Sequence, residues 1–337
     1  MLVPRSLPEQ VVVITGASSG IGRETALLLA EQHATVVLAA RNTAALDTLY
    51  DEVTRLGGTA LVCPTDVAEW DQVRRLATTA VRRFGRIDTW VNCAATSLYG
   101  PVHRLTSEEI TRAIQVILLG QVYGMKAALD QMRAQGQGGI VNVASGLSVQ
   151  AVPLQAAYVA AKHGVLGFAE SLRMELRHEG SPITVSTLLP SSVNTPLFQH
   201  ARSRLGVLPQ PIPPIYQPRV VAEAVRHAIV HPQPRMLVGG GAKLLELVHR
   251  AAPRLAGTLL LTVGRVVDKQ HSGRPDDGVD NLFAPSVGPG DTDGAFGQRV
   301  KSTSLYTTLL EQHPHRLRAL AAGATVLAVT ALRRRGR

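Results

Sequence analysis

Short apolar runs alternate along the chain with longer stretches in which apolar residues recur at helical spacing. The runs predict buried strands at residues 11–15, 35–40, 60–63, 87–91, 140–144, 183–189 and 236–238. The stretches between them predict helices near residues 23–32, 44–56, 70–84, 155–178 and 220–230, with a loop and a long helix within 101–133. Such regular alternation is typical of an α/β fold with a doubly wound parallel sheet.

The pattern changes after residue 241, so we expect one domain over residues 1–241 and a helical C-terminal extension over 242–337. Helical periodicity at 244–267 is broken by Pro253, and residues 271–297 form a loop rich in Gly, Pro and Asp. The apolar run 317–332, followed by three arginines, would span roughly 24 Å as a helix, against ~30 Å of bilayer hydrocarbon. It is either a membrane-associated tail, with arginines reaching the headgroups, or an ordinary terminal helix.

Composition and charge exclude several classes of protein. With 45% hydrophobic and 18% charged residues in 337, the chain is globular rather than disordered. The net charge of +10 raises nucleic acid as a partner, but the arginines are scattered and no nucleic-acid motif occurs, so we expect none. Cys63 and Cys93 lie in apolar runs, and the N-terminus lacks an apolar signal segment. We therefore expect a cytoplasmic protein, without a metal site, that contacts a membrane only if its C-terminal tail does.

The first predicted strand runs directly into a glycine-rich loop, residues 15–22, which reads TGASSGIG. A strand, a glycine loop and a helix N-terminus together bind a pyrophosphate, because backbone N–H groups can approach the phosphates. The spacing is G-x-x-x-G-x-G rather than the more familiar G-x-G-x-x-G. The candidate cofactor contacts in this loop are Gly16, Ser18, Ser19, Gly20, Ile21 and Gly22.

The residues after the second strand bear on the choice of cofactor. An acid at this point binds the ribose 2′-hydroxyl of NAD, whereas an arginine accommodates the 2′-phosphate of NADP. The chain has Ala40 and Arg41 here. We therefore expect NADP(H) to be favoured over NAD(H), the alternative being that Arg41 is merely solvated.

Three polar residues near the middle of the chain are the candidate catalytic groups. Tyr158 and Lys162 are four residues apart in a predicted helix and thus share one face, while Ser145 ends the neighbouring strand. A phenol has a pKa of roughly 10, and a nearby ammonium favours the phenolate. Tyr158 could then exchange a proton with a carbonyl or alcohol oxygen that Ser145 also contacts. The alternative is a surface Tyr and Lys without a function.

Taken together, these motifs resemble those of the short-chain dehydrogenases/reductases over residues 8–240. The resemblance implies a Rossmann-like fold, an NAD(P)-dependent reaction on CH–OH or C=O groups, and a catalytic trio of Ser145, Tyr158 and Lys162. Tyr158 and Lys162 would also contact the cofactor. The resemblance adds further cofactor-site residues, namely Asp66 and Val67 near the adenine, Asn92 supporting the sheet beside the cofactor, Ala94, and Val193 and Thr195 at the carboxamide.

The chain departs from the family pattern at three places. Ala95 and Ser191 stand where glycines are usual. Ile117 stands where the family commonly has an Asn that helps to hold a water near the catalytic Lys. Because isoleucine neither donates nor accepts a hydrogen bond, a proton relay at this position would be broken or rerouted.

Two function hypotheses follow. The first is an oxidoreductase that acts on a small carbonyl or alcohol, which we expect to be hydrophobic because the loop 195–218 is rich in apolar residues. The second, motivated by Ile117, is a cofactor-binding protein with low turnover that acts as a sensor or scaffold at a membrane. Small residues along the helix 155–178, which often forms a dimer interface in the family, favour a homo-oligomer.

Overall fold

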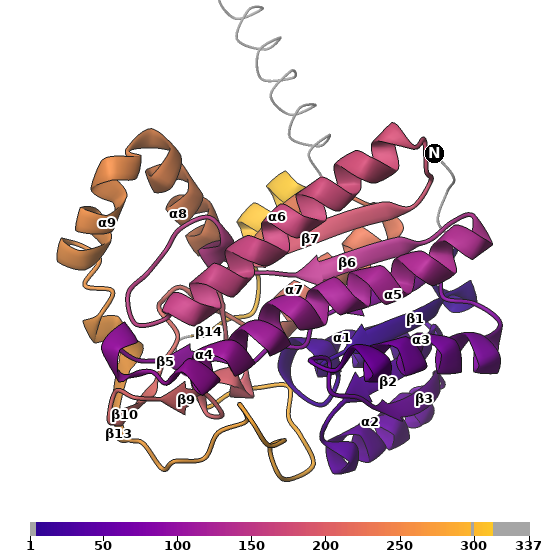
Figure 1. Ribbon diagram of the computed structural model, residues 1–337, viewed down its shortest axis with the longest axis horizontal. Coiled ribbons are helices and arrows are strands. Elements are labelled where there is room, and N and C mark those ends of the chain that lie inside the picture. The colour runs from indigo at the N-terminus through magenta and orange to yellow at the C-terminus, as the bar shows by residue number, and fades with distance from the viewer. Residues whose placement is uncertain (1–4, 298–299, 313–337) are drawn as a thin grey trace, which may run out of the picture.

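The computed structural model describes residues 5–297 and 300–312. Within them, seven parallel strands form a central sheet in the order β12-β7-β6-β4-β1-β2-β3 (Figure 1). Their bounds are β1 Val11–Thr15, β2 Thr35–Ala40, β3 Thr59–Pro64, β4 Thr89–Asn92, β6 Gly139–Val143, β7 Thr184–Pro190 and β12 Arg235–Val238. The sheet confirms the predicted α/β, doubly wound, Rossmann-like fold, and each strand lies within two residues of an apolar run.

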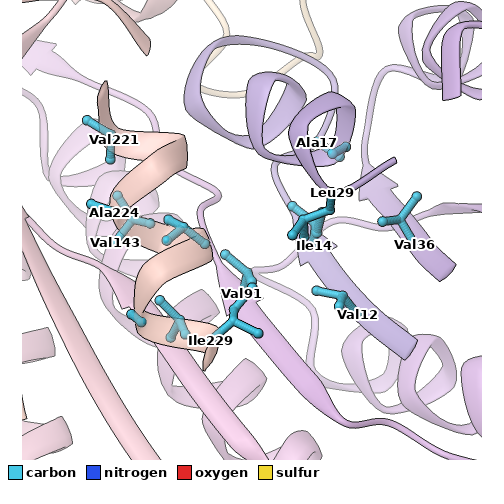
Figure 2. Close-up of a cluster of buried hydrophobic side chains, with 14 of the residues drawn as sticks. Val12, Ile14, Ala17, Leu29, Val36, Val91, Val143, Val221, Ala224 and Ile229 are labelled. Carbon is cyan, nitrogen blue, oxygen red and sulfur yellow. The ribbon is translucent and has the colours of Figure 1, made fainter. Parts of the chain in front are cut away.

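Helices cover both faces of the sheet. One face carries α1 (Gly20–Ala30), α2 (Thr43–Arg55) and α7 (Pro218–Val230), and the other carries α3 (Trp70–Phe84), α5 (Gly120–Gln135) and α6 (Ala156–His178). A hydrophobic core lies on each face of the sheet, and successive side chains of β1 point to opposite faces. Val12 and Ile14 belong to the first core, which contains side chains of α1, α2 and α7, while Val11 and Val13 belong to the second. Figure 2 shows part of the first core, where side chains from the sheet meet those of α1 and α7.

The strand order reverses beside β1, and this reversal places the site. The chain moves from β1 outward to β2 and β3, then returns to β4 on the other side of β1. The loops that follow β1 and β4 therefore diverge and leave a crevice at the carboxyl ends of the strands, which is where open α/β sheets bind ligands.

The long helix predicted within residues 101–133 is two helices. Helix α4 (Ser107–Ile114) and helix α5 are joined by a π-helical turn over Gln115–Leu119, which contains Ile117. Thr106 begins α4 with a capping box, in which its hydroxyl accepts from the Glu109 N–H and the Glu109 carboxylate accepts from the Thr106 N–H. Apolar periodicity alone could not place the π turn.

The extension contributes α8 (Gly240–Ala251) and α9 (Pro253–Thr262), separated at Pro253 as predicted. Short strands tie the later residues to the loops of the first domain. β13 (His271–Pro275) pairs with β10 (Val207–Pro209), while β11 (Ile215–Tyr216) lies between β8 (Ser192–Val193) and β14 (Val300–Lys301). In addition, β5 (Leu98–Tyr99) pairs with β9 (Arg202–Ser203).

The division of the chain at residue 241 stays a prediction. Among the described residues, no helix is long and apolar enough to cross a membrane. The apolar run 317–332, on which the predicted membrane contact depends, lies outside the described residues. Both cysteines are free, and burial raises the pKa of Cys63 to about 11 and that of Cys93 to about 12.

Two helical glycines provide a matched test of the packing between α5 and β4. A Cβ atom at Gly124 would lie 2.0 Å from Oδ1 of buried Asn92, whereas a Cβ at Gly167 on α6 would meet nothing within 4 Å. We expect Gly124→Ala to lower the free energy of unfolding by about 1–3 kcal/mol through overpacking. Gly167→Ala should raise it by roughly 0.5–1 kcal/mol, because alanine loses less entropy in a helix. Urea denaturation measures both, and equal effects would contradict the packing at Gly124.

Candidate active site

A cavity of about 410 Å³ occupies the crevice at the carboxyl ends of the strands. It brings together every predicted site residue except Asn92, which is absent from its lining. The predicted residues that line it are Gly16, Ser18, Ser19, Gly20, Ile21, Gly22, Arg41, Asp66, Val67, Ala94, Ser145, Tyr158, Lys162, Val193 and Thr195.

The glycine loop lies so close to its neighbours that two positions exclude any side chain. A Cβ at Gly16, which has φ +71°, would lie 2.6 Å from the Cα of Ala94 after β4. A Cβ at Gly22 would lie 2.3 Å from the Gly16 carbonyl oxygen. The first turn of α1 is thereby held against the ends of β1 and β4. Gly20, Ile21 and Gly22 of this turn line the cavity at a helix N-terminus, where anions bind, and the Gly20 N–H donates to the Asp291 carbonyl at 2.8 Å.

The three candidate catalytic residues come from two neighbouring elements. Ser145 follows β6, and its hydroxyl oxygen accepts from the Leu147 N–H at 3.1 Å. Tyr158 and Lys162 lie one turn apart on α6, with the Lys162 Nζ atom 5.7 Å from the centroid of the Tyr158 ring. Nζ of Lys162 donates to the Val143 carbonyl at 2.8 Å. A hydroxyl, a phenol and an ammonium therefore meet at one end of the cavity.

Burial dominates the proton affinities of this trio. It raises the pKa of Tyr158 to about 12, while a hydrogen bond with Ser145 acts in the opposite direction. Burial also lowers the pKa of Lys162 to about 8. The sequence led us to expect that Lys162 would lower the pKa of Tyr158. In the structure, burial removes hydration from the phenolate, and this raises the pKa of Tyr158 by more than the hydrogen bond with Ser145 lowers it.

Gln121 is a site residue that sequence reasoning missed. Its side-chain Nε2 donates to the Val143 carbonyl at 3.1 Å, so it shares that acceptor with Lys162. Its Oε1 atom is buried and has no hydrogen-bond partner among the described residues. The sequence feature that could have indicated this role is an amide side chain one helical turn after Ile117, between two residues without polar side chains.

Ile117 is completely buried in an apolar cluster rather than turned toward a polar group. Its neighbours in that cluster include Leu98, Tyr158 and Leu282. The next polar residue after Ile117 in the sequence is Gln121, while the effect of Ile117 on a proton relay stays a prediction.

Asn92 lies behind the cavity and links three elements. Its Nδ2 donates to Oδ1 of Asn142 on β6 at 2.9 Å and to the Gln121 carbonyl of α5 at 3.2 Å. Its Oδ1 accepts from the indole N–H of Trp90 at 2.8 Å. This arrangement fits the sheet-supporting role that the family resemblance implies for Asn92, rather than direct contact with a ligand.

Arg41 and Asp66 border the outer end of the cavity, and both have partners within the chain. Asp66 forms an ion pair with Arg112 at 2.5 Å. Arg41 donates to the backbone carbonyls of Asn281 and Phe283, which belong to the Gly-, Pro- and Asp-rich segment after β13. Sequence reasoning missed this segment, because its composition is that of a linker.

Beyond the catalytic trio, the cavity becomes apolar under the two helices of the extension. Leu244 and Leu245 of α8 and Leu260 of α9 line it, together with Ile212 and Val266. The same cavity is lined by Ser145 and Tyr158, so apolar side chains and two hydroxyl groups border one space.

Comparisons with known proteins identify the family. The family model of short chain dehydrogenases matches residues 10–206. The uncharacterized oxidoreductase YxnA of Bacillus subtilis is 38% identical over 306 residues, covering 90% of this chain and 85% of that protein. A short chain dehydrogenase/reductase from Burkholderia phymatum, solved in complex with NAD, has a TM-score of 0.69 and 25% identity, covering 75% of this chain and 97% of that one.

A second solved structure is the actinorhodin polyketide ketoreductase with NADPH, which has a TM-score of 0.63 and 30% identity. The similarity covers 70% of this chain and 98% of that one. The glycine loop, the trio and the strand order are thus found in a chain whose relatives are oxidoreductases. The chain belongs to the short-chain dehydrogenases/reductases and is an NAD(P)-dependent oxidoreductase acting on CH–OH and C=O groups.

Proposed function

We propose that this chain interconverts a carbonyl and an alcohol by hydride transfer with NADP(H), on a small hydrophobic substrate. The observation that carries the proposal is the convergence of Ser145, Tyr158 and Lys162 in the cavity that the glycine loop borders. A bound nicotinamide cofactor supplies the hydride for reduction and accepts it in oxidation.

Side chains of the protein donate and accept the proton. In reduction the carbonyl carbon gains a hydride and its oxygen gains the proton of the Tyr158 hydroxyl, and oxidation reverses both transfers. The Ser145 hydroxyl donates to the same oxygen, which stabilises the negative charge that develops there. Lys162, with a pKa of about 8, carries its charge at neutral pH and favours the phenolate form of Tyr158.

The cofactor assignment depends on the outer half of the cavity. The N–H groups of the glycine loop suit a pyrophosphate, and Asp66, Val67, Val193 and Thr195 line the wall on either side. Arg41 offers a fork of donors to a 2′-phosphate, and Ala40 brings no competing carboxylate. These residues support NADP(H) over NAD(H).

Two further features belong to the proposal. The apolar lining from α8 and α9 supports a hydrophobic substrate. Helix α6 leaves Ala156, Ala160 and Gly167 exposed beside Phe168, which is 42% exposed, and this combination of small and aromatic residues supports a homo-oligomer contact.

Burial of Ile117 in an apolar cluster is the observation that favours the second candidate, a cofactor-binding protein with low turnover.

We expect Tyr158→Phe to lower the rate of carbonyl reduction by ~10²–10⁴, because only the proton-transferring oxygen is lost. Affinity for the reduced cofactor should be nearly unchanged. Steady-state assays of aldehydes, ketones and quinones with NADPH or NADH measure the rate, and cofactor fluorescence measures binding. Tyr50→Phe, at a position 42% exposed, is the matched control. A Tyr158→Phe variant that retains more than half of the wild-type rate would refute the catalytic assignment.

We expect Lys162→Met to abolish activity yet stabilise the fold. Burial lowers the pKa of Lys162 from 10.5 to about 8, so holding its charge costs about 3 kcal/mol. Gln121 still satisfies the Val143 carbonyl in the variant. Between pH 8 and 10.5 the unfolded wild type binds the extra proton, so wild-type stability rises there with pH. The stability gain of the variant should therefore be largest below pH 8.

Thermal melts at several pH values test this expectation. The control is Lys126→Met, because Lys126 is exposed and pairs with Asp130 at 3.2 Å on the surface of α5. A Lys162→Met variant that is less stable than wild type at pH 7 would show that the buried ammonium holds the fold together.

A further inference from the structure

One segment of the extension crosses the cofactor side of the cavity. It comprises residues 280–294, called the strap below, and follows β13 in the chain. Figure 1 shows it as the orange loop that runs from β13 toward α2. Asn281, Pro285 and Ser286 of the strap line the same cavity as the glycine loop and Arg41.

The strap holds the guanidinium that the proposed function assigns to a 2′-phosphate. Nη1 of Arg41 donates to the Phe283 carbonyl at 3.1 Å, and Nη2 donates to the Asn281 carbonyl. A phosphate bound in the bidentate way takes one hydrogen from each of two guanidinium nitrogens. Nη1 and Nη2 of Arg41 each give one hydrogen to the strap, so a 2′-phosphate that uses the Nη1–Nη2 fork must compete with the strap for it.

The first half of the strap is anchored on both sides of this contact. Leu282 is 0% exposed and packs in the cluster that contains Ile117 and Tyr158. The Asn281 side chain accepts from the Thr96 hydroxyl at 2.8 Å. Asp280 forms an ion pair with Arg202 at 2.6 Å. These anchors make the displacement of residues 280–283 costly.

The second half of the strap follows the glycine loop. Nδ2 of Asn42 donates to the carbonyls of Ser286 and Gly288, at 2.8 and 3.0 Å. The Gly20 N–H donates to the Asp291 carbonyl at 2.8 Å. A Cβ at Gly290 would lie 2.1 Å from the Ser18 carbonyl oxygen, so the two backbones are in direct contact there.

We propose that the strap, by occupying Arg41, limits how far the protein prefers NADP(H) over NAD(H). The inference builds on the proposed function and adds the residues that tune its cofactor preference. Either dinucleotide competes with the strap at the Gly20 N–H, which donates to the Asp291 carbonyl, and a dinucleotide without a 2′-phosphate leaves the Arg41 contacts in place. A dinucleotide with the 2′-phosphate binds the Nη1–Nη2 fork of Arg41 only when residues 281–283 have moved away.

This mechanism has a definite thermodynamic consequence. A ligand that binds only one state of a two-state segment loses apparent affinity in proportion to the rarity of that state. Weakening the anchors of the strap therefore raises the affinity for NADPH, while the affinity for NADH changes little. The effect disappears without Arg41.

Fluorescence titration of NADPH and NADH tests the proposal on five proteins and one control variant. They are the wild type, Leu282→Ala, Asp280→Asn, Arg41→Ala and the double variant Arg41→Ala/Leu282→Ala. We expect Leu282→Ala to raise the NADPH-to-NADH affinity ratio about fivefold or more, the lower end of typical couplings between sites. Asp280→Asn, which does not alter a neighbour of Tyr158, should act in the same direction. Val287→Ala is the control, because Val287 is 100% exposed on the same strap.

Several results would overturn the proposal. If Leu282→Ala lowers the affinity for both cofactors equally, the strap holds any bound cofactor in place and does not discriminate between NADPH and NADH. If the ratio rises as much in the Arg41→Ala background, the selection does not pass through Arg41. If the wild type binds neither reduced cofactor, the proposed function itself fails, and the two failures are thus distinguishable.

Hydrogen exchange on the wild-type chain gives a result that does not depend on any variant folding. The Asn281 N–H donates to the His200 carbonyl at 3.0 Å, and the Leu282 N–H donates to the Asp280 carboxylate at 2.9 Å. Saturating NADP⁺ should speed the exchange of these amides, and saturating NAD⁺ should not. Equal protection with both cofactors would contradict the proposal.

Discussion

The Val143 carbonyl at the end of β6 accepts from two buried side chains, Lys162 of α6 and Gln121 of α5. A buried ammonium is tolerable only where it is hydrogen-bonded, so this oxygen fixes how both helices dock on the sheet. Tyr158 lies one turn from Lys162, and Asn92 donates to the Gln121 backbone from β4. The Val143 carbonyl thus connects the catalytic residues to the centre of the fold.

Close packing of the backbone also shapes the cofactor side of the cavity. Gly16 and Gly22 keep the first turn of α1 against the end of β4, because neither position has room for a Cβ. The strap then makes the outer wall from backbone carbonyls that hold Arg41. Ligand binding at this crevice therefore involves a rigid inner loop and an outer segment from the far end of the chain.

Much of this could be predicted from the sequence. Strands buried on both faces appear as continuous apolar runs, such as Val11–Thr15, and the site residues immediately follow such runs. The remainder depends on tertiary contacts. The Arg41 contact with Asn281 is made to a backbone carbonyl, which any residue would provide, so no side-chain pattern marks it. The π turn around Ile117 and the dominance of burial over the Ser145 hydrogen bond in the pKa of Tyr158 likewise depend on packing.

The central claim is that the buried trio supplies the proton that accompanies hydride transfer from the cofactor, rather than merely lining a cofactor-binding cavity. The most direct measurement uses NADPH with deuterium at the transferable position of nicotinamide C4, a panel of hydrophobic ketones and aldehydes, and mass spectrometry of the products. The account predicts an alcohol with one deuterium on its carbinol carbon, formed by the wild type and lost in Tyr158→Phe. Cofactor binding with no labelled alcohol from any member of the panel would contradict it.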